Sequence, residues 1–347
     1  MRKRIGAILL TLALIGGVFL AGCGGSKQAK PEDKGQPQGQ AQQNTGAAAK
    51  KLKVALVLPG PINDNGWNSV AYEGLKKAQA ELGIEGAYRE NVTQSDMEEA
   101  FRAYANQGYD VIIGHGFQFN DVAKKVGKDF PKVKFIVTSS NIAQGPNVAS
   151  LEVSNKEAGF IGGILAGLLT KSNKVAFIGG VNMPPITDAE AGFKAGAKMV
   201  NPKVEALGTL IGSWDDVAKA KETALAFIQQ GADVVLGDAN QAGLGVIEAA
   251  KSKNVYAVGF AGDQSNVAPD NVPASSKYDY SVAIKYIVKE ILDGKFEARG
   301  YVVATKEGAT GIIWNEKLKS KLNPEAVQKA EQVQKDLIEK KIDVNKL

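Results

Sequence analysis

The sequence is poor in the residues that most often carry chemistry. It holds one cysteine, Cys23, and one histidine, His115, in 347 residues. A single thiol cannot form an intrachain disulfide, and transition-metal sites need several histidine, cysteine or carboxylate ligands. The sequence also lacks a P-loop, a G-x-S-x-G motif and an H-E-x-x-H motif. We therefore predict no metal, no cofactor and no enzymatic activity.

Strong charge and aromatic residues are scarce as well. The formal net charge is +5, part of it supplied by residues 2–4, and no further block of lysine and arginine follows. Nucleic acid is therefore not an expected partner. Because aromatic residues make up only 7% of the chain, the three tryptophans deserve separate consideration: Trp67, Trp214 and Trp314.

The first 23 residues have the pattern of an export signal. A basic start, Met1–Arg4, precedes an apolar run, Ile5–Leu20, that is short for a membrane span, and Ala21 and Gly22 lead to Cys23. The segment resembles a bacterial lipoprotein signal with its lipobox. The resemblance implies cleavage before Cys23, lipid such as palmitate on the sulfur, and an extracytoplasmic, membrane-anchored protein. An ordinary signal peptide and an uncleaved anchor are the alternatives.

The next segment, 23–50, has a composition typical of a tether. After Cys23 it consists of Gly, Gln, Ala, Pro, Lys and other small or polar residues and contains no large apolar side chain, so it cannot bury enough surface to offset its ordering entropy. A flexible chain of this length reaches roughly 30 Å. We expect the folded part to begin near Lys51.

Short apolar runs alternate with amphipathic stretches over the rest of the chain. The runs lie at Val54–Leu58, Val111–Ile113, Phe135–Val137, Val175–Ile178, Val204–Ile211, Val234–Leu236 and Val255–Phe260. Nearly continuous apolar runs bounded by glycine or serine are typical of buried parallel strands. Between them, residues such as Ala71, Leu75, Ala78 and Leu82 share one helix face. This alternation predicts an α/β fold with parallel sheets.

The chain also repeats itself. Residues 107–114, 53–57 and 74–76 recur, in the same order, at 230–237, 174–178 and 192–194, each shifted by about 120 residues. We infer two similar lobes that face each other with the carboxyl ends of their strands across a hinged cleft. The expected limits are 51–153 plus about 276–300 for the N-terminal lobe and 154–275 plus about 301–320 for the C-terminal lobe. A helical tail is expected at 321–347.

Candidate ligand contacts are the polar and aromatic residues just after the predicted strands. They are Asp64, Trp67, Asn68, His115, Phe117, Trp214, Asp238, Asn240 and Asp263. Tryptophans from opposite lobes can clamp a planar ring, at about 1–3 kcal/mol per stacked base, and carboxylates and amides suit hydroxyl and ring N–H groups.

Several of these residues also have structural interpretations. Trp67 and Trp214 can simply pack at helix starts, and the lone His115 can be structural or face the cleft. Asp64 and Asp215 can be helix N-caps; we favour ligand contact for Asp64 and capping for Asp215. Asp263 follows a strand and is assigned to the cleft, whereas Trp314 has the context of a core residue.

Several motifs resemble the basic membrane protein family, the substrate-binding lipoproteins of ABC transporters that include purine nucleoside receptors. The motifs are Asp64-Asn65-Gly66-Trp67-Asn68, Ala71-Tyr72-Glu73-Gly74, Gly192-Phe193-x-x-Gly196-Ala197, Val200-Asn201-Pro202 and Gly212-Ser213-Trp214-Asp215-Asp216. The resemblance extends from about Lys53 to Trp314. It implies a type I periplasmic-binding-protein fold, capture of a purine nucleoside or nucleobase, and an ABC permease and ATPase as partners.

The resemblance also implies roles for single residues. Trp67 stands where the family commonly has a stacking phenylalanine, and Trp214 stands at the second aromatic position. The positions around the pocket are matched by Asp64, Asn68, Asp238 and Asp263. Many nucleoside-binding members end the first strand with aspartate, where this chain has Leu58 followed by Pro59. The Trp67 version resembles a subgroup associated with free bases, and the loop 237–240 differs from the more common glycine-rich one.

Other functions remain compatible with the sequence. A sugar or autoinducer receptor on the same fold would also use tryptophan and carboxylates. A surface nucleosidase would need an acid/base pair at a defined separation, and the aspartates here are scattered over several loops. A membrane-anchored sensory co-receptor would share the fold and the ligand but lack a permease.

Overall fold

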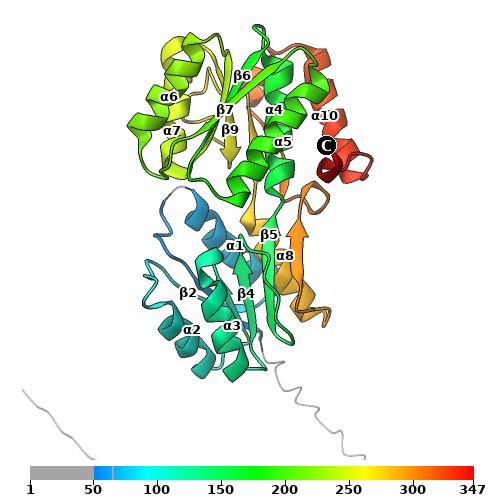
Figure 1. The fold of residues 1–347 in the computed structure, drawn as a ribbon. Coiled ribbons are helices and arrows are strands. Elements are labelled where there is room, and N and C mark those ends of the chain that lie inside the picture. Colours follow the sequence, from blue (N-terminus) through cyan, green and yellow to red (C-terminus); the bar gives the residue numbers. More distant parts are fainter. Residues whose placement is uncertain (1–50, 65) are drawn as a thin grey trace, which may run out of the picture. The chain divides into compact units, whose positions relative to one another are not determined.

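The computed structural model describes residues 51–64 and 66–347. The predicted signal peptide, Cys23 and the tether lie outside this range. The described chain forms two six-stranded sheets, each with helices on both faces (Figure 1). This arrangement confirms the predicted α/β fold with parallel sheets and two similar lobes.

The N-terminal sheet is parallel throughout and has the strand order β11-β5-β4-β3-β1-β2. Its strands are β1 (Lys53–Val57), β2 (Glu85–Arg89), β3 (Val111–Gly114), β4 (Lys134–Thr138), β5 (Val148–Val153) and β11 (Gly300–Val303). Its helices are α1 (Trp67–Leu82), α2 (Met97–Asn106), α3 (Asn120–Asp129) and α8 (Tyr280–Leu292), with a short 3-10 turn η1 (Phe117–Phe119).

The C-terminal sheet repeats this order as β12-β10-β9-β8-β6-β7, with only β12 antiparallel to its neighbour. Its strands are β6 (Lys174–Gly179), β7 (Glu205–Leu210), β8 (Val234–Asp238), β9 (Tyr256–Ala261), β10 (Ala274–Tyr278) and β12 (Thr310–Trp314). Its helices are α4 (Asn155–Leu169), α5 (Pro184–Val200), α6 (Val217–Gln229) and α7 (Gly243–Lys253), with 3-10 turns η2 (Asn240–Ala242) and η3 (Thr305–Glu307).

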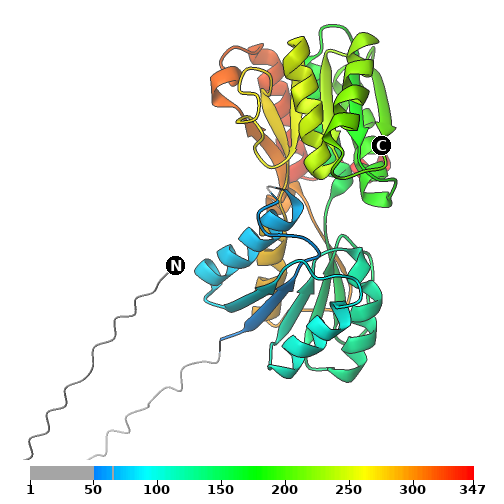
Figure 2. The same cartoon turned by 90° about the vertical axis from the view of Figure 1, so that its left-hand side faces the viewer.

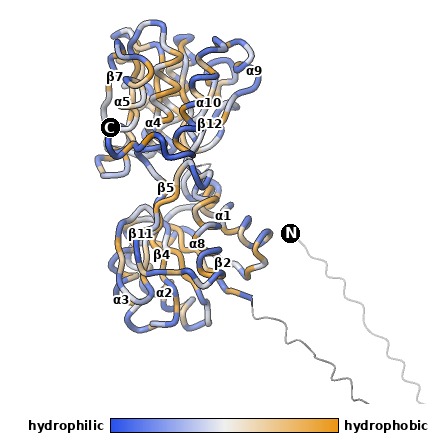
Figure 3. The backbone as a smooth tube through the Cα atoms, turned by 90° about the vertical axis from the view of Figure 1, so that its right-hand side faces the viewer, coloured by the Kyte–Doolittle hydropathy of each residue, from blue (hydrophilic) through white to orange (hydrophobic). Residues whose placement is uncertain are grey.

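Burial on both faces explains the continuous apolar runs. In β1, Val54 and Leu56 belong to a core that includes residues of α1 and α8, whereas Ala55 and Val57 belong to a second core with residues of α2 and α3. All four are fully buried, because a parallel strand covered by helices has no solvent-facing side. In Figure 3, β4 and β5 are accordingly drawn largely in orange and many surface loops in blue.

Three segments connect the lobes within the described chain (Figure 2). The first follows β5 and enters α4 at Ser154, whose side chain caps the helix; the second joins β10 to α8 through Asp279, also a cap. The third, 304–309, joins β11 to β12. The sequence analysis placed 301–320 in the C-terminal lobe, but Gly300–Val303 pairs with β5 in the N-terminal sheet.

The C-terminal tail is helical, with α9 (Glu316–Lys319), α10 (Pro324–Ile338) and η4 (Val344–Lys346). The apolar face of α10, with Val333 and Leu337 buried, packs on α4. Trp314 was predicted to be a core residue, but it ends the edge strand β12 only partly buried, with the Lys319 ammonium over its ring. Among the described residues, no helix combines the length and the apolar character of a membrane span.

Candidate functional site

Several candidate residues follow strands at the point where the strand order of each sheet reverses, whereas Trp214 follows β7 and Asp263 follows β9. In the N-terminal sheet, β1 lies between β2 and β3, so the loops after β1 and β3 diverge to opposite faces. The loops after β6 and β8 have the same relation in the C-terminal sheet. Open α/β sheets bind ligands at this switch point, outside the carboxyl ends of the strands. Trp67 and His115 belong to the first pair of loops, and Asp238 belongs to the second.

Trp67 is the first residue of α1, and the His115 ring packs against one face of its indole. The two rings stack with their centroids 3.7 Å apart. Gly116, with φ 121°, leaves room for the indole, because a Cβ there would lie 2.8 Å from Trp67 Cη2. Trp67 itself is only partly buried. It therefore has one face on the protein and keeps some surface exposed to solvent.

His115 is fully buried, and both ring nitrogens have partners. Its Nε2 lies 3.1 Å from the Trp67 carbonyl oxygen, which requires Nε2 to donate. Its Nδ1 then accepts from the Thr138 hydroxyl at 2.8 Å, and Thr138 Oγ1 accepts from the Gly116 N–H at 3.0 Å. Burial lowers the pKa of His115 to about 3, so the ring is neutral at physiological pH. The sequence left both a structural role and a ligand contact open for His115; in this structure its ring packs against Trp67.

Asp64 organises the start of α1. Its carboxylate accepts from the backbone N–H groups of Gly66, Asn68 and Ser69 and from the Asn68 side-chain amide, all at 2.8–2.9 Å. Burial opposes ionisation of Asp64, but these hydrogen bonds outweigh it and lower the pKa of the carboxyl. Asp64 was predicted to contact the ligand rather than to cap a helix. In the structure its carboxylate instead accepts hydrogen bonds from the backbone at the start of α1.

Asn68 is left with an unpaired oxygen. The side chain is 7% exposed, its amide nitrogen donates to Asp64, and its Oδ1 is buried with no hydrogen-bond partner among the described residues. A buried acceptor without a partner costs about 1–3 kcal/mol. Phe117, the first residue of η1, is by contrast 51% exposed.

In the other lobe, Trp214 lies after β7 and packs over the end of β6. A Cβ on Gly180 would lie 2.5 Å from two carbons of its ring, so the indole rests on the glycine backbone. The Trp214 carbonyl accepts from the Ala242 N–H at 2.8 Å, which fixes the loop against η2. Asp215 was predicted to be the N-cap of the following helix, but Asp216 has that role and accepts from the Lys219 N–H. Asp215 is one residue too early to reach it.

Asp238 ends β8 and is the second group with an unpaired oxygen. The residue as a whole is half-buried, but Oδ2 has no exposed surface and no hydrogen-bond partner in the described chain. Burial raises the pKa of this carboxyl to about 7. Tyr278, at the end of β10, is buried; burial first, then the neighbouring Tyr280 and charges including Asp238, raise the pKa of its phenol. Asp238 therefore offers a buried, unpaired carboxyl oxygen at the carboxyl end of β8, next to the end of β6.

The two remaining candidates are exposed. Asp263 follows β9, and its carboxylate accepts from the Ser265 N–H at 2.9 Å. Asn240 has a left-handed backbone, with φ 47°, and its side-chain oxygen lies against the α-carbon of Gly66 at the start of α1. This contact brings together the loop after β1 and the loop after β8. The candidate residues of the two lobes thus meet at Gly66 and Asn240.

Two residues that contact His115, Thr138 and Tyr280, were not among the predicted site residues. Thr138 ends β4 and orients His115, while Tyr280 starts α8 and places its ring edge-on to His115 at 5.2 Å. The Tyr280 hydroxyl is within hydrogen-bonding distance of the Ser139 side chain and backbone N–H. Thr138 and Ser139 follow a predicted strand just as the chosen residues do, so the same criterion would have found them.

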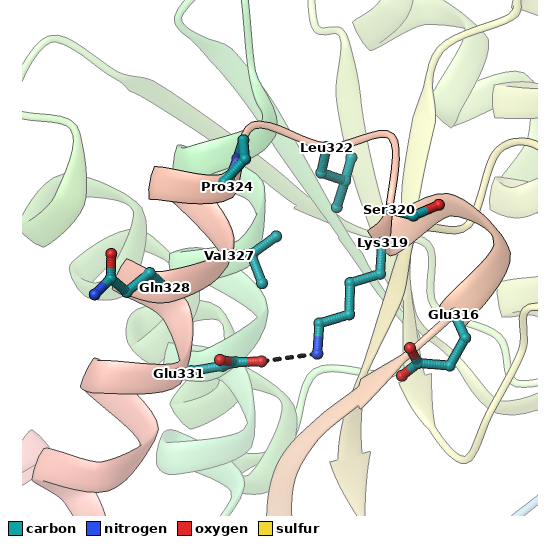
Figure 4. Close-up of a pocket in the computed structure, with 8 residues that line it drawn as sticks. All are labelled: Glu316, Lys319, Ser320, Leu322, Pro324, Val327, Gln328 and Glu331. Carbon is teal, nitrogen blue, oxygen red and sulfur yellow. Dashed lines mark ion pairs between the residues drawn. The ribbon is translucent and has the colours of Figure 1, made fainter.

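The concave surface shown in Figure 4 is separate from these residues. It lies between α9 and α10, and its central feature is an ion pair of 2.8 Å between Lys319 and Glu331. It contains none of the candidate residues. Across residues 51–64 and 66–347, no group of three or more histidine, cysteine or acidic side chains is placed to hold a metal ion.

Comparison with known proteins identifies the family. The family model described as "ABC transporter substrate-binding protein PnrA-like" matches residues 51–347. The ABC transporter nucleoside-binding protein BmpA of Lactococcus lactis subsp. cremoris is 31% identical over 318 residues, 85% of this chain and 87% of that protein. The transcriptional activator protein med of Bacillus subtilis is 30% identical over 246 residues, 71% of this chain and 76% of that protein.

Solved structures agree on the fold. A solute-binding protein of an ABC transporter system from Aeropyrum pernix K1 superposes with a TM-score of 0.70 at 21% identity and covers 84% of this chain and 92% of its own. This likeness confirms the type I periplasmic-binding-protein architecture predicted from the sequence. With the family model extending over the whole described chain, the protein belongs to the PnrA-like family of ABC transporter substrate-binding proteins.

Proposed function

We propose that this protein is a lipid-anchored, extracytoplasmic receptor that captures a purine base or nucleoside between its lobes. It then delivers the ligand to an ABC permease and its ATPase. The family assignment supports the receptor role, and the printed name of the Lactococcus relative supports a nucleoside-type ligand. The proposed contacts are Trp67, Asn68 and Phe117 from one lobe and Trp214, Asp238, Asn240 and Asp263 from the other. Asp64 and His115 are left out of this set, because their polar side-chain atoms already have partners within the protein.

One observation carries the proposal: each lobe has, at the ends of its strands, a tryptophan and a buried oxygen with no hydrogen-bond donor among residues 51–64 and 66–347. Asn68, with its unpaired Oδ1, directly follows Trp67 in α1. The backbone carbonyl of Asp238 accepts from the Gly180 N–H at 2.9 Å, and the Trp214 ring packs on Gly180. A purine supplies a flat face for each indole and N–H groups for each oxygen. Both oxygens then gain the hydrogen bond that the protein alone does not provide.

The N-terminal lobe also bears on the choice between base and nucleoside. Leu58, where many nucleoside receptors of the family have aspartate, is fully buried and apolar. It therefore offers no hydrogen bond to a ribose hydroxyl or to the base. Any ribose contact falls on the second lobe, where Asp238, Asn240 and Asp263 are available. A free base needs none of these ribose contacts, so Leu58 is compatible with a nucleobase ligand.

Replacing either tryptophan tests the proposed stacking. We expect Trp67→Ala and Trp214→Ala each to weaken binding of adenine or adenosine by roughly 1–3 kcal/mol, because one stacked face is lost. Trp67→Phe and Trp214→Phe, which keep an aromatic face, should lose less. Titration calorimetry on the purified full-length protein measures these differences, and Trp314→Ala, far from the proposed contacts, is the control.

The ligand panel separates the alternatives. Adenine, adenosine, guanosine and a set of monosaccharides are tested side by side. Binding of a sugar without any purine would replace the purine assignment by a sugar receptor on the same fold. Release of free base from adenosine would instead indicate a nucleosidase. Unchanged purine affinity in both alanine variants would make the tryptophans packing residues.

Lipid attachment at Cys23 is tested directly by mass. The lipobox resemblance leads us to expect that residues 1–22 are absent from the native protein and that residue 23 carries acyl chains. One acyl chain binds a membrane only marginally, so more than one chain is expected. Mass spectrometry of protein extracted from native membranes measures both features. Detection of Met1, or of an unacylated residue 23 alone, would contradict the anchor.

A further inference from the structure

The single histidine, His115, is not among the proposed ligand contacts. His115 is fully buried between three groups: the Trp67 ring at 3.7 Å, the Thr138 hydroxyl at 2.8 Å and the Tyr280 ring at 5.2 Å. A buried polar side chain is costly unless each of its polar atoms is paired. Here both ring nitrogens have hydrogen-bond partners, which fixes the orientation of the imidazole plane as well as its position.

The hydrogen bonds specify one orientation of the ring. Nε2 donates to the Trp67 carbonyl, which belongs to the same residue whose indole stacks on the imidazole. The histidine therefore contacts both the backbone and the side chain of Trp67. Thr138, itself anchored by the Gly116 N–H, prevents the ring from rotating. Moving the indole plane would disturb this whole set of contacts.

The support continues toward the connection between the lobes. Tyr280 meets His115 edge to face and stands two residues from Tyr278, whose ring is 5.4 Å from its own. Tyr278 in turn stacks on Phe260, at the end of β9, with centroids 5.9 Å apart. A continuous series of rings thus runs from Trp67 to the C-terminal sheet through the segment that joins β10 to α8.

We infer that His115 is a positioning residue that fixes the plane of the Trp67 indole and ties it, through Tyr280, to the β10–α8 connection. The inference rests on the proposed function for its consequence in binding, since Trp67 is there the stacking face. It assigns His115 no contact with the ligand. Its role is to make the indole rigid before the ligand arrives, which reduces the ordering cost of binding.

The test observes Trp67 itself before it measures affinity. The full-length protein labelled with fluorotryptophan gives fluorine NMR signals for its three tryptophans, and Trp67→Phe identifies the Trp67 signal. In ligand-free protein, we expect His115→Ala to shift and broaden this signal, because the stacked ring and the hydrogen bond to Trp67 are lost. His115→Phe, which restores a ring of similar size, should shift it less. Thr138→Val should shift it in the same direction as His115→Ala.

Affinity is the second readout. We expect His115→Ala to weaken adenine or adenosine binding about threefold to tenfold, the usual range for losing one aromatic pair, and His115→Phe to recover part of this loss. The matched control is Phe135→Leu, a fully buried ring of the same lobe that packs on the opposite face of the sheet, against Phe101. It should lower stability without moving the Trp67 signal or changing the affinity.

Two results would overturn the inference. One is an unmoved Trp67 signal in a folded His115→Ala protein; the other is an equal shift in Phe135→Leu, which would make the effect general loosening. The signal should also stay constant between pH 8 and pH 5, because burial keeps His115 uncharged, with a pKa of about 3. If the parent binds no purine, the proposed function fails, but the NMR result on ligand-free protein still decides the positioning role.

Discussion

At the scale of single residues, two oxygen atoms define what the ligand must supply. Asn68 Oδ1 and Asp238 Oδ2 are buried and have no donor within the part of the chain that the structure describes, and each such atom costs about 1–3 kcal/mol. Proteins retain costs of this kind mainly at functional sites. A ligand that donates to both atoms removes the cost from both lobes together. Donor groups, more than shape alone, should therefore determine which small molecules bind.

Asp238 leads to a prediction about pH. Burial raises its pKa from 3.8 to about 7 in the ligand-free protein, so near pH 6 the carboxyl is mostly protonated. A ligand N–H or O–H that donates to it favours the ionised form, lowers the pKa and releases a proton. We expect affinity to rise between pH 6 and pH 8, with proton release detected by calorimetry in buffers of different ionisation enthalpy.

Asp238→Asn is the control for this linkage, because it cannot titrate, and its affinity should be flat over the same range. Proton uptake on binding would contradict the assignment of Asp238 as an acceptor. The same raised pKa has a consequence without ligand. Between about pH 4 and pH 7, Asp238 binds more protons in the folded state than in the unfolded state. The free energy of unfolding therefore decreases as the pH rises through that window.

At the scale of elements, α4 and α5 pack with their backbones in direct contact. A Cβ on Gly163 would overlap the Phe193 carbonyl oxygen, and a Cβ on Gly196 would overlap the Phe160 carbonyl oxygen. The helix backbones therefore touch directly. This explains why the Gly-Phe-x-x-Gly-Ala motif of α5 is a useful family marker: its glycines are required by packing, not by the ligand.

We predict that Gly163→Ala destabilises the protein by about 1–3 kcal/mol, because the added methyl group has no space and the helices must separate. In an exposed helix the same change would stabilise by up to about 1 kcal/mol, since alanine is the better helix former. Chemical denaturation measures the difference. Gly262→Ala, where no atom lies within 4 Å of the added Cβ, should stay within about 0.5 kcal/mol of the parent. A neutral Gly163→Ala would show that the helices can move apart freely.

At the scale of the whole molecule, the third connection between the sheets, 304–309, is hydrogen-bonded to the first turn of α4. Glu157 of α4 accepts from the Thr305 N–H and hydroxyl at 2.9 and 2.7 Å and from the Thr310 hydroxyl at 3.2 Å. This arrangement attaches the third connection to the start of α4, next to Ser154 of the first connection.

We expect the lobes to close on the ligand, because contacts from both strand ends form together only when the lobes approach. Small-angle X-ray scattering should show a smaller radius of gyration for the bound protein than for the free protein. A Trp67→Ala/Trp214→Ala double variant, at the same ligand concentration, should show a much smaller change. An identical radius for free and saturated parent protein would instead indicate a rigid or already closed receptor.

The sequence was sufficient for the architecture because the relevant signals are local. Strands such as Val111–Gly114 and Val234–Asp238 are buried on both faces, so each reads as an apolar run, and the turns at Gly108 and Gly231 mark their starts. The repeat at a shift of about 120 residues then predicted two lobes, which the matching strand orders confirm. The strand-end criterion also pointed to Trp67, Trp214 and Asp238 without any structure.

Only the tertiary structure decided which partner each side chain takes. His115 pairs with Trp67, 48 residues earlier, and with Thr138, 23 residues later, and no local pattern distinguishes such a support from a ligand contact. The Asp64 carboxylate accepts from the backbone at the start of α1, and Asp216, not Asp215, caps α6. The strand β11 pairs with β5 in the N-terminal sheet. A strand is encoded by its own residues, whereas a hydrogen bond depends on which distant groups folding brings within about 3 Å of it.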